Sequence, residues 1–126
     1  MKRKLETKKV LLSELKEFPG NPNVHPEEQV KAIAESMERY GQYYPIVVDE
    51  NMMILCGHGK KKALEYRGDK EAFITMMYGL TDTEKKKLVL EDNKIQTMSH
   101  VNFGDMEKLI KEIGEVDIIG FTPEYL

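Results

Sequence analysis

The chain has few of the residues that mark secreted, membrane-spanning or metal-clustered proteins. Cys56 is the single cysteine among 126 residues, which excludes an internal disulfide and a cysteine-rich zinc site. No stretch approaches the roughly 20 apolar residues that cross a bilayer. The basic opening MKRKLETKK also lacks the hydrophobic segment of a signal peptide. These absences predict a cytoplasmic protein without a membrane partner.

A strong charge of one sign is missing as well. The 19 Lys and Arg residues stand against 22 Asp and Glu residues, so the formal charge is −3. This balance argues against a uniformly basic, histone-like mode of nucleic-acid binding, although local basic patches remain available. What the chain does have is apolar material, at 40% of its residues, and a length that suits one domain.

Turn residues and apolar spacing predict the order of the elements. Residues 1–9 are predicted to be a frayed basic arm, and residues 10–126 a single domain. The expected elements are a strand from Val10, a helix from Pro26 to Gly41, a hairpin over 43–56, a helix after Gly57, a strand over 72–77, a helix from a Thr81 capping box to about Asn93, and a helix capped by Asp105. This order predicts an α+β fold with a small mixed sheet and flanking helices.

The turn after the hairpin has the features of a phosphate site. Lysines that follow it in the first turn of a helix oppose the helix dipole, at roughly 0.3–1 kcal/mol each, and a bound anion would remove this conflict. Two glycines let backbone N–H groups approach such an anion closely. The residues predicted to hold phosphate are Gly57, His58, Gly59, Lys60 and Lys61. The alternative is a tight turn followed by a solvated basic helix face.

Other polar residues support weaker predictions. The triplet Glu91 to Asn93 closes a predicted helix with three oxygen-bearing side chains, which suit Mg²⁺ shared with a substrate phosphate. A solvated helix end is the alternative interpretation. The three histidines have no metal-ligand spacing, which argues against a zinc site. Cys56 ends an apolar run and is expected to be buried as a small hydrophobe.

Several short segments follow one another in an order that is more specific than any one of them. They are Asn21 to His25, Ile33 to Met37 with Tyr40-Gly41, Pro45 to Asp49, Gly57 to Ala63, Leu80-Thr81 with Glu84-Lys85, Glu91 to Lys94, and Gly120-Phe121. In this order they resemble the ParB/sulfiredoxin superfamily. The resemblance covers residues 10–121 and is greatest to the ParB-like N-terminal domains, also called ParB-like nuclease domains, of phage and mobile-element proteins.

The resemblance implies a fold in which the glycine turn binds nucleotide phosphates at the end of a strand. Chromosome-partition members hold CTP with Gly-Glu-Arg-Arg at this turn, where the present chain reads Gly57-His58-Gly59-Lys60. A later Glu-Asn pair of the superfamily, which helps to hold metal and triphosphate, matches Asp92-Asn93. The resemblance thus makes Asp92 and Asn93 the expected metal ligands. Three positions where relatives carry arginine are Gly59, Asn23 and Gln96 here.

Other branches of the superfamily fit less well. Sulfiredoxins place their catalytic cysteine directly after the first glycine of the turn, where this chain has His58, so peroxiredoxin repair is not supported. Free-serine kinases have Gly-His-His-Arg in the same turn. The match to Gly57-His58 keeps a phosphotransferase acting on a small hydroxyl compound among the alternatives.

Residues and resemblance together predict a nucleotide-binding module in a DNA-associated process of a phage or mobile element, with slow nucleotide hydrolysis. The expected ligand is a nucleoside triphosphate, CTP or ATP, with Mg²⁺. The alternatives are a Mg²⁺-dependent nuclease, a small-molecule phosphotransferase, and a partner-docking domain with a vestigial site. The expected partners are DNA, bound weakly through its phosphates, and a fused or separate DNA-modifying protein.

Overall fold

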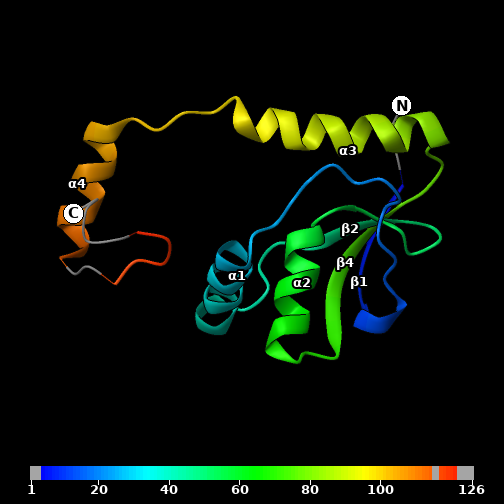
Figure 1. Ribbon diagram of the computed structural model, residues 1–126, viewed down its shortest axis with the longest axis horizontal. Coiled ribbons are helices and arrows are strands. Elements are labelled where there is room, and N and C mark those ends of the chain that lie inside the picture. The colour runs from blue at the N-terminus through cyan, green and yellow to red at the C-terminus, as the bar shows by residue number, and fades with distance from the viewer. Residues whose placement is uncertain (1–3, 115–116, 122–126) are drawn as a thin grey trace.

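A small mixed sheet with helices around it forms the body of the protein (Figure 1). The computed structural model describes residues 4–114 and 117–121. Its elements are β1 (Leu5–Leu11), a 3-10 turn η1 (Leu12–Glu14), α1 (Glu27–Tyr40), β2 (Ile46–Asp49), β3 (Ile54–Cys56), α2 (His58–Arg67), β4 (Glu71–Met77), α3 (Asp82–Thr97) and α4 (Phe103–Ile113). The expected α+β fold with flanking helices is confirmed.

The sheet brings the predicted phosphate turn to one of its ends. Its strand order is β1-β4-β2-β3, with β4 and β2 parallel and the other two pairs antiparallel. β2 and β3 form the expected hairpin, and the chain then passes through α2 before it returns as β4. Gly57 is therefore the single residue between the end of β3 and the start of α2.

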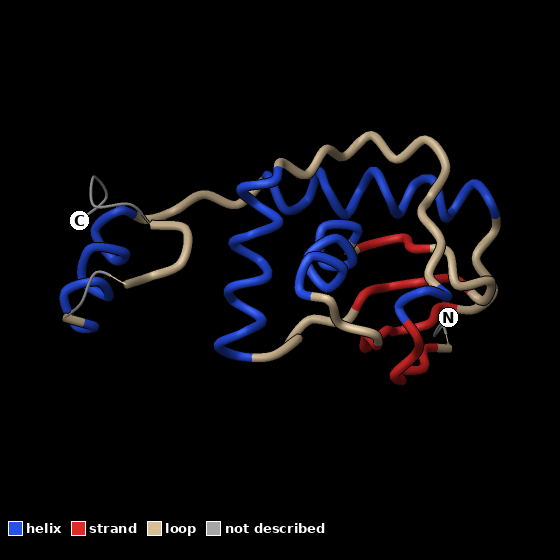
Figure 2. The backbone as a smooth tube through the Cα atoms, turned by 60° about the horizontal axis from the view of Figure 1, so that its bottom comes forward, coloured by secondary structure: helices blue, strands red, loops and turns tan. Residues whose placement is uncertain are grey.

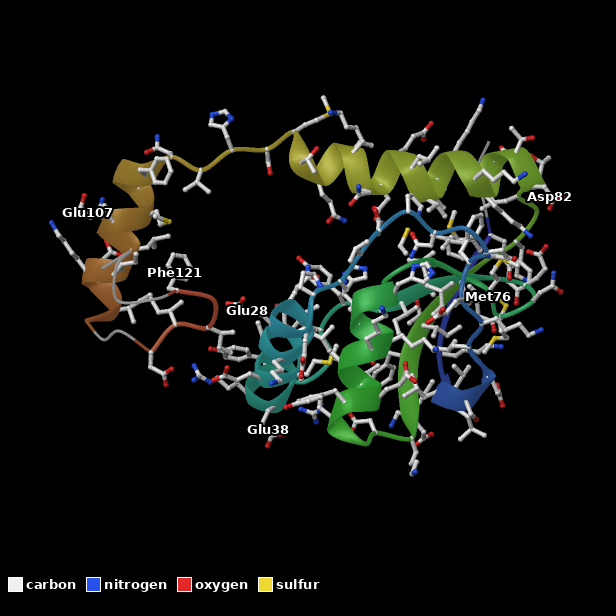
Figure 3. All side chains as sticks on the ribbon, viewed as in Figure 1. Glu28, Glu38, Met76, Asp82, Glu107 and Phe121 are labelled. Atoms are coloured by element: carbon white, nitrogen blue, oxygen red, sulfur yellow. The ribbon has the colours of Figure 1, made fainter. Side chains whose placement is uncertain are left out.

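One hydrophobic cluster joins the sheet to α1 and α2, which pack side by side (Figures 1 and 2). Alternate residues of β4 point into it, because successive side chains of a strand face opposite sides. Figure 3 places Met76 of β4 among the crowded side chains of the body. The buried residues contributed by α1, β2 and β4 are Val30, Ala34, Met37, Ile46, Val48, Ala72, Ile74 and Met76.

The basic arm predicted over residues 1–9 is shorter in the structure, because β1 begins at Leu5. The strand begins at Leu5 and pairs with β4 along its whole length, so residues 5–9 are not a free arm. Residues 1–3 lie outside the described residues. The sequence predicted a strand only from Val10. It missed residues 5–9 because their partners on β4 lie more than 60 residues away and their lysines lie on an exposed surface, where Lys9 stands over the ring of Phe73 at 5.2 Å.

α3 begins as expected and ends later than expected. The Thr81 side chain accepts a hydrogen bond from the Glu84 N–H at 3.1 Å, and the Glu84 carboxylate accepts one from the Thr81 N–H at 2.9 Å. This is the predicted capping box. The helix runs to Thr97 and not to about Asn93, so the triplet Glu91 to Asn93 lies inside it. Among its residues only Lys85 and Val89 are buried, and α3 lies across one end of the sheet (Figure 1).

α4 stands apart from the body in Figure 1 and buries none of its residues. Its cap is Asn102, whose side-chain oxygen accepts from the Asp105 N–H at 3.1 Å, so the predicted cap at Asp105 is wrong by one helical turn. Farther along, the Asp117 carboxylate accepts from Arg39 of α1 at 2.7 Å. No helix within the described part of the chain has the length and apolarity needed to cross a membrane.

Candidate functional site

The predicted site residues lie around a cavity of about 590 Å³. Five segments form its walls: the loop before α1 with the first half of that helix, Tyr44-Pro45 before β2, the end of β3, the first turn of α2, and the middle and second half of α3. The cavity lining includes Gly57, His58, Gly59, Lys60, Asp92 and Asn93. The fold therefore brings the expected phosphate turn and the expected metal ligands to the same place.

The first turn of α2 offers backbone donors to this cavity. Gly57 precedes the helix with φ +102°, a left-handed conformation that side chains disfavour. No side chain caps this end of α2 by a hydrogen bond. Since the first N–H groups of a helix have no partner within it, His58, Gly59 and Lys60 carry donors and a positive dipole end suited to an oxyanion.

The two lysines predicted for the phosphate site separate in the structure. Lys60 lines the cavity and holds its Nζ over the ring of Tyr44, 5.5 Å from the centroid. Lys61 does not line it. Its Nζ lies 3.5 Å from Glu65 and 3.8 Å from Glu17, on a different side of α2. Successive residues of a helix point about 100° apart, so only one of two adjacent lysines faces a given site.

His58 lines the cavity and also holds the loop before α1. Its ring Nε2 accepts a hydrogen bond from the Phe18 N–H at 3.2 Å. Burial lowers the pKa of His58, so the ring is neutral at pH 7. Because Nε2 accepts, the hydrogen is on Nδ1. The side chain of His58 therefore mainly holds the loop before α1 in place. Its contribution to a phosphate site is the backbone N–H.

Asp92 and Asn93 supply oxygen atoms on the α3 side of the cavity. The Asp92 carboxylate also accepts a hydrogen bond from Gln96, one turn later, at 3.2 Å. Carboxylate and amide oxygens are the ligands that Mg²⁺ takes from proteins, with water and substrate phosphates completing its shell. This donor set fits Mg²⁺ brought in with a phosphate ligand. Within residues 4–114 and 117–121, no three His, Cys, Asp or Glu side chains are grouped to hold a metal by themselves.

Cys56 lies at the end of β3 on the wall of the cavity and is partly buried. Burial, and after it the charge and hydrogen bonding of Asp92, raise the pKa of the Cys56 thiol to about 12. A thiol with such a pKa is almost entirely protonated near neutral pH and is a poor nucleophile. The sequence predicted a buried cysteine, and the structure agrees only in part, because Cys56 is partly buried and lines the cavity.

The Cys56 environment predicts slow labelling of the native protein by a thiol reagent at pH 7.5, compared with the protein unfolded in urea. Asp92→Asn removes a negative charge that disfavours the thiolate, so this variant should label faster than the wild type. Glu91→Gln, on the same helix but outside the cavity lining, serves as the matched control. Equal labelling rates for native and unfolded protein would contradict the assignment.

Sequence reasoning did not single out three polar groups of the cavity. They are His25, Gln29 and Tyr44, which come from the loop and helix before the hairpin and from the approach to β2. The sequence signal was the position of His25 in the Asn-Pro segment that carries the resemblance. Its separation from His58 by 33 residues hid the fact that both histidines line one cavity.

Comparison with curated proteins finds a relative in Escherichia coli. The chain is 33% identical over 76 residues to the ParB-like nuclease domain-containing protein YnaK of Escherichia coli K12. The match covers 60% of this chain and 87% of that protein. A comparison with protein-family models found no match.

Solved structures with the same fold include ParB N-terminal domains. A pNOB8-like ParB N-domain is 19% identical with a TM-score of 0.59, covering 70% of this chain and 35% of that one. The C-terminally truncated chromosome-partitioning protein ParB of Caulobacter crescentus, complexed with CTP-γ-S, is 17% identical with a TM-score of 0.68. That match covers 88% of this chain and 66% of the partitioning protein. At these identities the likeness establishes the fold.

Proposed function

This chain belongs to the ParB-like nuclease domain family, and we propose that its cavity binds a nucleoside triphosphate, CTP or ATP, together with Mg²⁺. The observation that carries the proposal is the meeting of the α2 N-terminus, Lys60 and the Asp92-Asn93 pair around one cavity. A partitioning protein of the same fold, crystallised with CTP-γ-S, supports this choice of ligand class.

Each group has a distinct part in the proposed complex. Backbone N–H groups of the first turn of α2 donate to phosphate oxygens, and Gly57 allows the phosphate to approach the turn. The Lys60 ammonium offsets phosphate charge from the side of Tyr44. Asp92 and Asn93 hold Mg²⁺, which neutralises charge on the phosphates when bound. Lys61, predicted from the sequence as a phosphate ligand, has no part in this arrangement because it pairs with Glu17 and Glu65.

The proposed setting is a DNA-associated process of a phage or mobile element in the cytoplasm, with slow nucleotide hydrolysis. The family name of the curated relative supports a nucleic-acid connection. DNA contacts through surface lysines such as Lys8 and Lys9 of β1 would be made to phosphates, so they would be weak, independent of sequence and sensitive to salt. A fused or separate DNA-modifying protein would then supply sequence recognition.

Calorimetric titration of the purified chain with CTP, ATP, GTP and UTP, each with and without Mg²⁺, tests the proposal. We expect saturable binding of CTP or ATP that is tighter with Mg²⁺. Incubation of the same protein with duplex DNA, and with serine and ATP, tests the nuclease and phosphotransferase alternatives. Absence of binding for all four nucleotides would overturn the proposal and favour a docking domain with a vestigial site.

Lys60→Ala is expected to weaken nucleotide binding by roughly 10- to 100-fold, the range given by losing one charge-assisted hydrogen bond of about 1.5–3 kcal/mol. Lys61→Ala and Lys62→Ala are the matched controls, since neither residue lines the cavity. Both should bind as the wild type does in the same titration. An unchanged affinity in Lys60→Ala, or an equal loss in all three variants, would contradict the assigned role.

A further inference from the structure

Gly59, the second residue of α2, has no space beside it for a side chain, although its backbone conformation would permit one. It is buried inside a regular helix and its φ is not positive. A Cβ added there would lie 2.9 Å from Nδ1 and 3.1 Å from Cε1 of the His25 ring. Real Cβ atoms do not approach other atoms that closely, so the imidazole occupies the volume that a side chain at position 59 would need.

The His25 ring, in the loop before α1, is held in this place by the first turn of that helix. Its Nδ1 lies 2.8 Å from Oε1 of Gln29, the third residue of α1, and an amide oxygen only accepts hydrogen bonds. Nδ1 therefore carries a hydrogen, which leaves Nε2 as the second functional atom of the ring. Among the residues that the structure describes, none forms a hydrogen bond to that Nε2. The ring is half-buried and lines the same cavity as Lys60.

The side chains around the cavity carry little net positive charge. The groups that face His25 across it are His58 and Lys60 of α2, Asp92 of α3 and Cys56 of β3. His58 and Cys56 are neutral at pH 7, because burial lowers the pKa of the first and raises the pKa of the second. The positive charge of Lys60 and the negative charge of Asp92 cancel. A nucleoside triphosphate therefore meets little positive charge from side chains unless His25 contributes it.

We propose that His25 is a phosphate-contacting residue of this cavity. Its imidazole supplies a positive charge that residue 59, a glycine, cannot supply. In the complex, Nδ1–H donates to Gln29 and Nε2–H donates to a phosphate oxygen. The second proton comes from solvent as the ligand binds, so that both ring nitrogens then donate. The inference rests on the proposed function and adds a residue to it.

A double-mutant cycle at positions 25 and 59 tests the inference. His25→Ala should weaken binding of the Mg²⁺-nucleotide at least about tenfold. Gly59→Ala should weaken it by a similar factor, because the new methyl group displaces the imidazole, while alanine suits the helix better than glycine does. His25→Ala with Gly59→Ala should bind no worse than His25→Ala alone, since the clash is then absent. His100→Ala, a histidine outside the cavity, is the control and should bind normally.

Two further measurements do not depend on the size of an affinity loss. The His25 ring resonances of the ligand-free protein should shift in Gly59→Ala and stay unchanged in His100→Ala. Titrations in buffers of different ionisation enthalpy should show proton uptake for the wild type and less for His25→Ala. If the wild type binds a nucleotide and His25→Ala binds it equally well, the role of His25 is wrong while the proposed function stands. If the wild type binds none, both are wrong.

Discussion

Lys85→Met is expected to lower the free energy of unfolding by about 3–5 kcal/mol, because it leaves a buried carboxylate without its cation. Asp49 is fully buried at the end of β2, and Lys85 Nζ lies 2.9 Å from its Oδ2. The other oxygen of Asp49 accepts from the N–H groups of Asn51 and Met53, both at 2.9 Å. The Lys85 ammonium is thus the one cation that the described part of the chain pairs with Asp49.

Urea unfolding followed by circular dichroism measures this loss. Lys86→Met is the matched control, since Lys86 is an exposed neighbour on the same helix and its replacement should change stability by less than about 0.5 kcal/mol. Because Lys85 is one of the two buried residues of α3, Lys85→Met should also loosen the helix that carries Asp92 and weaken nucleotide binding. Equal stabilities of the two variants would contradict the importance of the buried pair.

The same pair predicts the direction of the pH dependence. Burial by itself raises the pKa of Asp49, but the hydrogen bonds from Lys85 and from two backbone N–H groups outweigh it and hold the pKa below its ordinary value. A carboxyl with a lowered pKa stabilises the fold above its unfolded pKa and loses that contribution as the pH falls through its folded pKa. The stability that Asp49 gives the wild type should therefore be full at pH 7 and be lost progressively below about pH 4, as urea unfolding at several pH values would measure.

Gly57→Ala is expected to cost about 2–5 kcal/mol of stability, from two separate causes. A side chain at a positive φ costs about 1–2 kcal/mol, and φ here is +102°. In addition, the new Cβ would lie 3.3 Å from both Cα and Cγ1 of Ile46, a fully buried residue of β2, and such overpacking costs about 1–3 kcal/mol. Because the turn carries the N-terminus of α2, its displacement should also weaken nucleotide binding.

Gly68→Ala separates the two causes of the Gly57→Ala effect. Gly68 ends α2 with φ +81°, but no atom lies within 4 Å of the Cβ that alanine would add. It should therefore show only the conformational cost of about 1–2 kcal/mol and bind nucleotide normally. Urea unfolding of both variants measures the difference. If Gly57→Ala loses no more stability than Gly68→Ala, the close approach to β2 is unimportant.

Features that depend on neighbours in the chain were predictable from the sequence. The capping box at Thr81 follows from two side chains three residues apart, and the hairpin from two apolar runs around a short turn. The end of α1 at Gly41 was predicted from a glycine after an apolar helical stripe. In each case the residues that decide the structure lie within one or two turns of each other.

Features that depend on distant contacts were not predictable in the same way. The first five residues of β1 are a strand because their backbone pairs with β4, although the sequence predicted a basic arm up to residue 9. The buried pair of Asp49 and Lys85 joins a residue of the hairpin to a residue of α3. In the sequence, nothing distinguishes these two charged residues from the many exposed ones. A polar residue becomes structurally important when burial removes the competing water, and burial is a property of the packed molecule.

The sequence by itself determined the class of fold, the glycine turn before α2 and the presence of acidic and amide residues on α3. Local hydrogen bonding, helix periodicity and the conformational freedom of glycine account for these features. Only the tertiary structure decided that Lys60 faces the cavity while Lys61 pairs with Glu17 and Glu65. It also decided that the His25 ring fills the space beside Gly59. The physical reason is that the direction of a side chain toward a site depends on how whole elements pack, and contacts between residues far apart in the chain fix that packing.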